Sequence, residues 1–571
     1  MQVENPPAAI GFKSEIYNLQ PEISNSSMTT RTRTDVLLLA GFCAFLFFYG
    51  LGQFGLVGAD EPRYAQVARE MLQRRDWITP VLGGQPWLEK PPLYYWQAML
   101  AYSLYGVSDA AARAPSALNA TLLVIAVYLF LRRFGSGVEL DGALITASCA
   151  GVIGYARAAG TDMALASAFS IAMLSWWGWR ESGKRAYLAA FYLFMALGTL
   201  AKGPVAPFLA ALVIVFYAAA VREFRTIVQT LWPPGIAIFC AISLPWYFTV
   251  QMRNPEFFRV FFLQHNLERF SSNLYHHHAP FWYYLPVTLL ALMPWAVFVT
   301  AASVESARRW WAERSTSAPG NENCELRFRL FLLLWLIVPV VFFSISQSKL
   351  PGYILPAVPA GALLLADYLR QHLKQEEVAT PRKWLVVLHA VLAGACIVPA
   401  LFAGYFATQH RLPTGQSMLG ALAFGFVLAA GVAFTLFSRA GLRMLRFVTL
   451  IPVVLAVAAV LKLGSASLDQ TLSSLPLARQ IASVETYSLP LAVFEVRRET
   501  EYGLAFYRNQ TIVRYERDSV PAEEHLLVAP ENLRAEVVKQ VADRRILLLG
   551  HFAPQHLDYY WVAAVSVGSA H

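Results

Sequence analysis

Two aspartates stand at the ends of long apolar segments in this 571-residue chain. Asp60 follows the first such segment, in GADEPRYA, and Asp162 precedes a later one, in ARAAGTDMALA. Taken singly, each aspartate is also explained as the N-cap of a helix. A carboxylate at the level of a membrane surface is energetically unfavourable unless it is paired with a cation or has a functional role. We therefore expect both to face one cleft and to take part in chemistry there.

Four cations are expected on the same face of the membrane. They are Lys90 in LEKPPLYYW, Lys202 in LAKGPVAP, Arg269 in HNLERF and Lys349 in SQSKLPGY. Any one of them is explained by a side chain that snorkels from a helix end. As a group they are unusual, because basic residues normally gather in cytoplasmic loops and these four are expected on the opposite face. Together they are suited to neutralising a phosphate that is carried on a lipid.

A carboxylate and an imidazole, Glu89 and His265, are available as ligands of a divalent metal ion. They lack the tight spacing of a metal motif, and the three consecutive residues His276, His277 and His278 cannot all face one metal from one helix or strand. The chain contains no P-loop, HExxH, GxSxG or GxGxxG turn that opens a βαβ unit. The sequence therefore predicts a substrate that arrives already activated on a lipid, without a nucleotide.

The composition places these residues in a membrane protein. Apolar and aromatic residues make up 56% of the chain and charged residues only 15%, against about 25% in soluble proteins. This excludes a water-soluble enzyme. The net charge of +9 is explained by positive cytoplasmic loops, so no nucleic-acid partner is expected.

Apolar runs long enough to cross about 30 Å of hydrocarbon predict about thirteen transmembrane helices in a domain spanning 35–464. The runs lie near 35–57, 111–131, 140–158, 163–180, 185–201, 204–221, 228–250, 281–301, 328–346, 351–370, 384–406, 417–438 and 444–464. Residues 1–34 form a predicted cytoplasmic segment. The first run lacks a cleavage site of small residues, so we interpret it as an uncleaved span.

Loop charge decides how to interpret 91–107, which is apolar but short and begins with two prolines. Leaving it out of the spans puts basic clusters such as Arg132/Arg133 and Arg439/Arg443/Arg446 in the cytoplasm. Counting it as a span would put them outside. We therefore expect an interfacial or re-entrant element in the first of two long outer loops, 58–110 and 251–280.

Both outer loops contain patterns of their own. The first predicts an amphipathic helix that lies on the membrane surface, with the apolar residues Tyr64, Val67, Ala68, Met71 and Leu72 and the polar residues Arg63, Arg69, Arg74 and Arg75. The second is expected to order as a lid over bound lipid, with the aromatic residues Phe257, Phe258, Phe270 and Tyr275.

The composition changes after Gly464, where a small soluble α/β domain is predicted over 465–571. Short strands are expected at 491–496, 511–515, 525–529, 544–550 and 559–567, with a helix at 531–543. Because thirteen spans is an odd number and the N-terminus is cytoplasmic, this domain is expected on the outer side.

Several of these segments carry a family resemblance. DEPRYA, LEKPPLYYW, ARAPSALN, AKGPVAP and HNLERF resemble the polyprenyl-phosphate-sugar glycosyltransferases related to protein O-mannosyltransferases. SKLPGYILPAVPA is similar to the branch that transfers 4-amino-4-deoxy-L-arabinose from undecaprenyl phosphate to lipid A. The resemblance implies a GT-C-like polytopic α-helical enzyme of the bacterial inner membrane with a periplasmic active site. Less negative lipid A would then give resistance to polymyxin and other cationic peptides.

The resemblance also implies roles for individual residues. Asp60 and Asp162 would be the catalytic acids. The ligands of the carrier phosphate would include Lys90, Arg269 and Tyr353, joined by the cations Arg63, Lys349 and Lys202. Glu89 and His265 would correspond to the metal ligands. The donor would be an undecaprenyl phosphate-linked sugar, attacked once with inversion, and the acceptor a phosphate of lipid A.

Three alternatives remain at this stage. One is a transferase that acts on hydroxyls of protein or glycan. The second is a lipid transporter, although transporter sites lie near the middle of the membrane rather than at one face. The third is a scaffold whose outer domain binds a partner, and it leaves Asp60, Lys90 and Asp162 unexplained.

Overall fold

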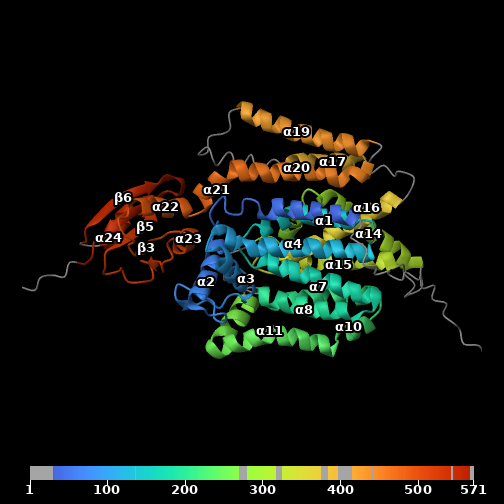
Figure 1. Cartoon of the computed structure of the whole chain (residues 1–571), viewed down its shortest axis with the longest axis horizontal. Helices are drawn as coiled ribbons and strands as arrows, with labels where there is room; N and C mark the ends of the chain where they lie inside the picture. Colours follow the sequence, from blue (N-terminus) through green and yellow to red (C-terminus); the bar gives the residue numbers. More distant parts are fainter. Residues whose placement is uncertain are drawn as a thin grey trace, which may run out of the picture.

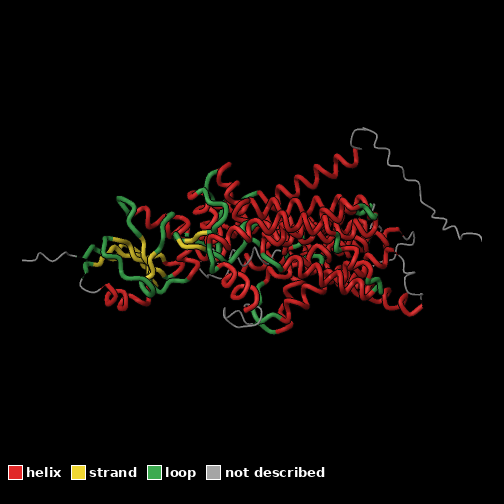
Figure 2. Tube along the Cα trace, turned by 90° about the horizontal axis from the view of Figure 1, so that it is seen from below, coloured by secondary structure: helices red, strands yellow, loops and turns green. Residues whose placement is uncertain are grey.

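The computed structural model describes residues 30–135, 137–268, 279–316, 324–374, 383–396, 415–438, 441–541 and 544–565. A bundle of long helices forms most of this part of the chain, and a smaller α/β region adjoins one end of the bundle (Figure 1). Seen from below, the strands gather at that end and helices fill the rest (Figure 2).

Helices lie within all the apolar runs predicted to span the membrane. In chain order they are α1 (Thr30–Cys43) with the π-helix η1 (Ala44–Phe48), α4 (Asp109–Phe134), α5 (Glu139–Ser148), α6 (Ala150–Ala156), α7 (Asp162–Ser182), α8 (Arg185–Lys202), α9 (Val205–Ala220), the short α10 (Arg225–Thr230), α11 (Pro233–Arg253), α13 (Tyr284–Ala291), α14 (Ala296–Thr316), α15 (Cys324–Ile345), α16 (Val358–Lys374), α17 (Lys383–Ala395), α19 (Gly415–Phe437) and α20 (Leu445–Ala459). Short irregular turns, η3 (Phe281–Tyr283), η4 (Pro351–Ala357), η5 (Gly441–Met444) and η6 (Val460–Gly464), complete several of them.

Within the described ranges, five helices are long and apolar enough to cross a membrane. A sixth is counted if the bent pair formed by Phe281–Ala291 and Ala296–Arg314, which meet at 114°, is one span. The expectation of a polytopic helical membrane protein is therefore confirmed.

The first outer loop folds into two packed helices. The predicted amphipathic helix is present as α2 (Asp60–Arg74), and 91–107 contains α3 (Leu93–Tyr105). With 13 residues, α3 is only about 20 Å long, which is too short to span the hydrocarbon. The fully buried Tyr94 and Tyr95 of α3 pack with Tyr64 of α2.

One expectation for α2 is wrong. Its apolar face does not rest on a membrane surface, because α3 covers it and Val67, Ala68 and Met71 are buried in that contact. The basic face is also used within the protein, since Arg69 donates a hydrogen bond to the carbonyl of Phe506, 2.9 Å away, in the C-terminal region. An amphipathic pattern specifies two faces but does not say whether lipid or another helix covers the apolar one.

The C-terminal region contains the predicted α/β fold. Its five strands are ordered β4-β3-β5-β7-β6; β3 is parallel to β4 and β5, and β7 is antiparallel to β5 and β6. The strands are β3 (Leu491–Val493), β4 (Val513–Arg514), β5 (His525–Pro530), β6 (Ile546–Phe552) and β7 (Leu557–Val562). One face packs against α22 (Leu475–Val484) and α23 (Arg498–Arg508), and the other against α24 (Arg534–Val541). The helix α21 (Ser465–Leu472) connects this region to the bundle.

A buried ion pair joins the first outer loop to the bundle. Arg113 of α4 is 1% exposed and donates to both carboxylate oxygens of Glu61, at 3.3 and 2.6 Å. It also donates to the carbonyls of Leu51, Phe54 and Gly55 at 2.8 to 2.9 Å. Because a buried charge without its partner is very unfavourable, this pair ties the start of α2 to α4.

We expect Arg113→Ala to destabilise the protein strongly. Removing one partner of a buried pair leaves the other charge unpaired, which costs about 3–5 kcal/mol. The midpoint of thermal unfolding of the purified protein in detergent measures the loss. The matched control is Arg132→Ala, an exposed residue of the same helix. Equal midpoints for the two variants would show that the pair is dispensable.

Candidate active site

Asp60 is the first residue of α2 and is paired with a cation one turn later. Its Oδ1 accepts a hydrogen bond from Nη2 of Arg63 at 2.5 Å. Asp60 does not cap the helix, because the N-cap is Ala59 and no side chain caps it. The side chain of Asp60 is 62% exposed and that of Arg63 only 12%. The pair therefore presents an accessible carboxylate that is held by a buried cation.

Three aromatic rings surround the guanidinium of Arg63. The ring centroids of Tyr64, Trp87 and Tyr502 lie 5.0, 5.2 and 5.7 Å from its central carbon. Burial acts to lower the pKa of Arg63, but the neighbouring oxygens of Tyr64 and the carboxylates of Asp60 and Glu89 raise it overall. Arg63 is thus a fixed positive charge, and one of the rings around it comes from the C-terminal region.

Asp162 forms a second pair of the same kind. It is the first residue of α7, where the N-cap is Thr161 and no side chain caps the helix, and its Oδ1 accepts a hydrogen bond from Nζ of Lys202. Nζ of Lys202 also lies 5.0 Å from the ring centroid of Tyr353. Lys202 ends α8 and Tyr353 lies in η4, so three segments meet at this carboxylate.

Close packing of the backbone fixes the position of Asp162. A Cβ atom added to Gly352 would lie 2.7 Å from Oδ1 of Asp162 and 2.8 Å from the hydroxyl of Tyr155. Real Cβ atoms do not approach other atoms so closely. Glycine is therefore required where η4 passes over the carboxylate.

Tyr64 joins the two pairs into one site. Burial raises the pKa of this phenol, and the charges of Asp60, Asp162 and Glu89 raise it further, against the opposing effect of Arg63. A single side chain therefore interacts electrostatically with both aspartates. That Asp60 and Asp162 share one cleft stays a prediction, and this shared electrostatic effect on Tyr64 is consistent with it.

Among the other predicted residues, Glu89 is near this site, since its carboxylate acts on both Arg63 and Tyr64. Lys90 and Glu89 are partly buried in the turn before α3. Lys349 is buried and donates to the carbonyl of Ser346 at 2.5 Å. Arg269, the triple histidine and the aromatic residues Phe270 and Tyr275 lie outside the described residues, as does the side chain of His265 in the π-helix η2 (Arg259–Glu268).

In the described ranges, no three His, Cys, Asp or Glu side chains form a group that could hold a metal ion. The predicted pair of Glu89 and His265 is not tested by this, because the side chain of His265 lies outside the described residues. We derive no chemical step through a metal.

The beginning of the second outer loop packs closely onto the bundle. Phe257 and Phe261 are buried beside Trp246 and Tyr247 of α11, and their own rings stack 5.2 Å apart. Phe258, in contrast, is 54% exposed. Of the predicted aromatic residues, Phe257 therefore anchors the start of the loop, whereas the ring of Phe258 is accessible.

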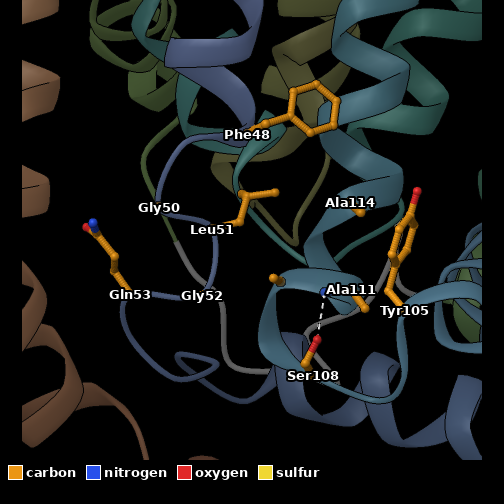
Figure 3. A pocket seen from close by; sticks show the side chains of 10 residues that line it. Phe48, Gly50, Leu51, Gly52, Gln53, Tyr105, Ser108, Ala111 and Ala114 are labelled. Carbon is orange, nitrogen blue, oxygen red and sulfur yellow. Dashed lines mark hydrogen bonds between the residues drawn. The ribbon is translucent and has the colours of Figure 1, made fainter.

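An apolar hollow of about 500 Å³ lies near the Arg113 pair but outside the charged site (Figure 3). Phe48 and Leu51 line it from the end of the first span, and Tyr105 from the end of α3. At its edge the hydroxyl of Ser108 accepts a hydrogen bond from the amide of Ala111 and caps α4.

The analysis of the sequence missed Tyr64, Trp87, Gly352 and Tyr502 as parts of the site. Tyr64 was assigned only to the apolar face of a helix. Tyr502 lies more than 400 residues away from Arg63 along the chain. No local spacing identifies such a neighbour, although the aromatic residues close to DEPRYA and LEKPPLYYW were a partial signal.

The chain is similar to known membrane glycosyltransferases. Residues 34–261 match the family model for dolichyl-phosphate-mannose-protein mannosyltransferase. The undecaprenyl phosphate-alpha-4-amino-4-deoxy-L-arabinose arabinosyl transferase of Aeromonas hydrophila is 32% identical over 397 residues, which cover 68% of this chain and 69% of that protein. The enzyme of the same name from Serratia proteamaculans is 31% identical over 417 residues, covering 70% and 71%.

The fold is also shared with solved structures. The crystal structure of ArnT from Cupriavidus metallidurans bound to undecaprenyl phosphate matches with a TM-score of 0.73 and 24% identity, over 92% of this chain and 97% of that chain. Its apo state matches with a TM-score of 0.74 and 22% identity, over 93% and 98%. The fold is therefore the GT-C fold of a polytopic, multi-pass inner-membrane protein.

The match to the mannosyltransferase model and the matches to whole relatives agree on one kind of enzyme. The protein is a glycosyltransferase that uses a sugar carried on a polyprenyl phosphate. The two relatives are more than 30% identical to this chain, and the matched region covers more than two thirds of each of them. The chain therefore belongs to the family of undecaprenyl phosphate-4-amino-4-deoxy-L-arabinose arabinosyl transferases.

Proposed function

We propose that this protein transfers 4-amino-4-deoxy-L-arabinose from undecaprenyl phosphate to a phosphate of lipid A. The observation that carries the proposal is the convergence of Asp60 with Arg63 and Asp162 with Lys202 around Tyr64. The names of the relatives supply the donor. The positive sugar would lower the negative charge of lipid A and so give resistance to polymyxin and cationic peptides.

The proposed topology follows the charge of the loops. Thirteen spans with a cytoplasmic N-terminus (1–34) place the first outer loop and the α/β region (465–571) in the periplasm. The charged site then faces the periplasmic leaflet. The ends of α14 and α16, which carry Arg308, Arg309 and Arg370, face the cytoplasm.

The leaving group is the carrier phosphate. The bond between the anomeric carbon and the phosphate oxygen breaks, the electron pair stays with that oxygen, and an oxygen of the acceptor phosphate forms the new bond from the opposite side. Cations in a partly dehydrated cleft stabilise the developing negative charge. We assign this role to Lys90, Arg269 and Lys202, with Tyr353 beside Lys202 as a hydrogen-bond donor to the phosphate.

Asp60 serves a purpose other than proton removal. A phosphate monoester has a second pKa of about 6, so the acceptor is already largely ionised at neutral pH and needs no base. The exposed carboxylate instead binds the ammonium of the aminosugar or stabilises the positively charged transition state. Asp162, held by Lys202, lines the same site from α7.

A transferase acting on hydroxyls of protein or glycan is the second candidate, favoured by the mannosyltransferase model that matches 34–261. A hydroxyl acceptor, unlike a phosphate, does need a base. Incubation of the purified protein with labelled polyprenyl-phosphate aminoarabinose and two acceptors separates the candidates. Our proposal expects label on lipid A and none on peptide or glycan.

We expect Asp60→Asn to lower the rate of transfer about a hundredfold or more, because a lost charge at the reacting centre costs on this order. Initial rates with labelled donor and lipid A measure the effect. The control is Glu536→Gln, which removes an exposed carboxylate on α24 and leaves the rate unchanged. Near-normal turnover by the Asp60 variant would remove Asp60 from the mechanism.

We expect Gly352→Ala to reduce turnover on the order of 10- to 100-fold, because displacement of a catalytic group by a fraction of an ångström has effects of this size. The added methyl group must displace Asp162 or Tyr155. Gly154→Ala is the control, since a Cβ there meets nothing within 4 Å. Unchanged turnover in both variants would show that the site tolerates movement of Asp162.

We expect Tyr502→Ala to lower kcat about fivefold with little change in the KM for the donor, because one cation–π contact that orients Arg63 is worth roughly 1 kcal/mol. Tyr502→Phe keeps the ring and should restore the rate. Tyr487→Ala, a 59% exposed tyrosine of the same region, is the control. If the Phe variant is as slow as the Ala variant, stacking on Arg63 is not the reason for the effect.

A further inference from the structure

A large hollow lies far from the charged site, between α13 and α14 on one side and α16 and α17 on the other. Its volume is about 1000 Å³. Most of its wall is aliphatic, with the side chains Leu289, Leu290, Met293, Val297, Leu385 and Leu388. We name this hollow the α14 groove.

Apart from Thr300, whose hydroxyl donates to the carbonyl of Ala296, the polar residues that line the α14 groove lie at one end of it. They are Glu305, Arg308 and Arg309 of α14, Tyr368 and His372 of α16, and Trp384 at the start of α17. From Ala296 to Arg308 the helix rises about 18 Å, which is close to half of the roughly 30 Å hydrocarbon thickness. The groove therefore has the depth of one leaflet, with its polar end at a membrane surface.

That surface is opposite to the one with the catalytic carboxylates. Gly352 in η4 contacts Asp162, and α16 begins at Val358 and runs 17 residues away from η4 to Lys374. His372 is in its last turn. A ligand seated at the polar end is thus about one helix length, roughly 25 Å, from Asp162.

The charges at the polar end favour an anion. Arg309 is paired with Glu305 and donates to Gln371 at 3.1 Å. Nε2 of His372 also lies 3.8 Å from Glu305. Glu305 thus faces one arginine and one histidine, and the second arginine, Arg308, is exposed at the rim. Trp384, 57% exposed, has the position of an aromatic residue at a membrane interface.

We propose that the α14 groove binds an anionic phospholipid of the leaflet opposite to the active site. An acyl chain fills the aliphatic channel, and Arg308 at its rim binds the lipid phosphate and the negative headgroup. The position of the polar end separates this lipid from the sugar carrier, whose phosphate has to reach Asp60 and Asp162. The proposal does not depend on which sugar is transferred.

Binding of phosphatidylglycerol with a fluorescent acyl chain to the full-length protein in neutral detergent tests the proposal. Competition with unlabelled phosphatidylglycerol and phosphatidylcholine measures the preference for the anion. Arg308→Gln should reduce that preference about fivefold, since one basic residue near anionic lipid is worth roughly 1 kcal/mol. Arg314→Gln is the control, an exposed arginine later in α14 that does not line the groove.

A second variant tests the channel itself. Ala301→Phe fills the aliphatic wall and should weaken binding of both phospholipids, whatever their charge. The proposal is overturned if Arg308→Gln keeps the full preference for phosphatidylglycerol, or if Ala301→Phe binds as tightly as the unmodified protein. It is also overturned if undecaprenyl phosphate displaces the probe better than phosphatidylglycerol does, because the groove then belongs to the carrier.

Discussion

The buried pair of Arg113 and Glu61 is the constraint on which the geometry of the site depends. Arg113 binds the carboxylate of Glu61 and three carbonyls at the end of the first span. Glu61 also accepts hydrogen bonds from the amides of Val57 and Ala159, at 2.8 and 2.9 Å. The two aspartates of the candidate site are near neighbours of these positions, Asp60 beside Glu61 and Asp162 three residues after Ala159. Through Glu61 this ion pair is linked to a segment 98 residues away along the chain, in line with the role of buried pairs in fixing one arrangement.

The C-terminal region is held on the bundle along a line of matched contacts. Tyr502 and Phe506 of α23, and Asn509 at its C-cap, meet Arg63, Arg69 and Gln73 of α2 in the same order. The hydroxyl of Tyr507 accepts from the amide of Leu56 at 2.6 Å and donates to Asp109 at 2.7 Å. Figure 1 shows α23 beside α2. The C-terminal region therefore helps to shape the surroundings of Asp60.

Much of the fold could be predicted from the sequence because its signals are local. Apolar runs located the helices of the bundle, and short β-branched or aliphatic runs located all five strands of the C-terminal sheet. Asp60 and Asp162 could be selected because a carboxylate at a span end is unusual. Arg63 and Lys202 were predicted as cations of the site, but which cation pairs with which aspartate could not be predicted, and Tyr502 is remote in sequence. The N-cap alternative was wrong because both side chains turn to cations instead of to the helix amides.

The bare backbone at Gly352 limits how this enzyme can diverge. Only a hydrogen atom fits between the backbone at residue 352 and Asp162 of α7. No larger side chain at this position can therefore contact a different sugar. Relatives that accept another donor must therefore acquire that preference elsewhere around the pocket, for example at the rings that enclose Arg63. Substitutions among the rings around Arg63 can change the preference for the sugar, whereas Gly352 cannot be replaced without moving Asp162.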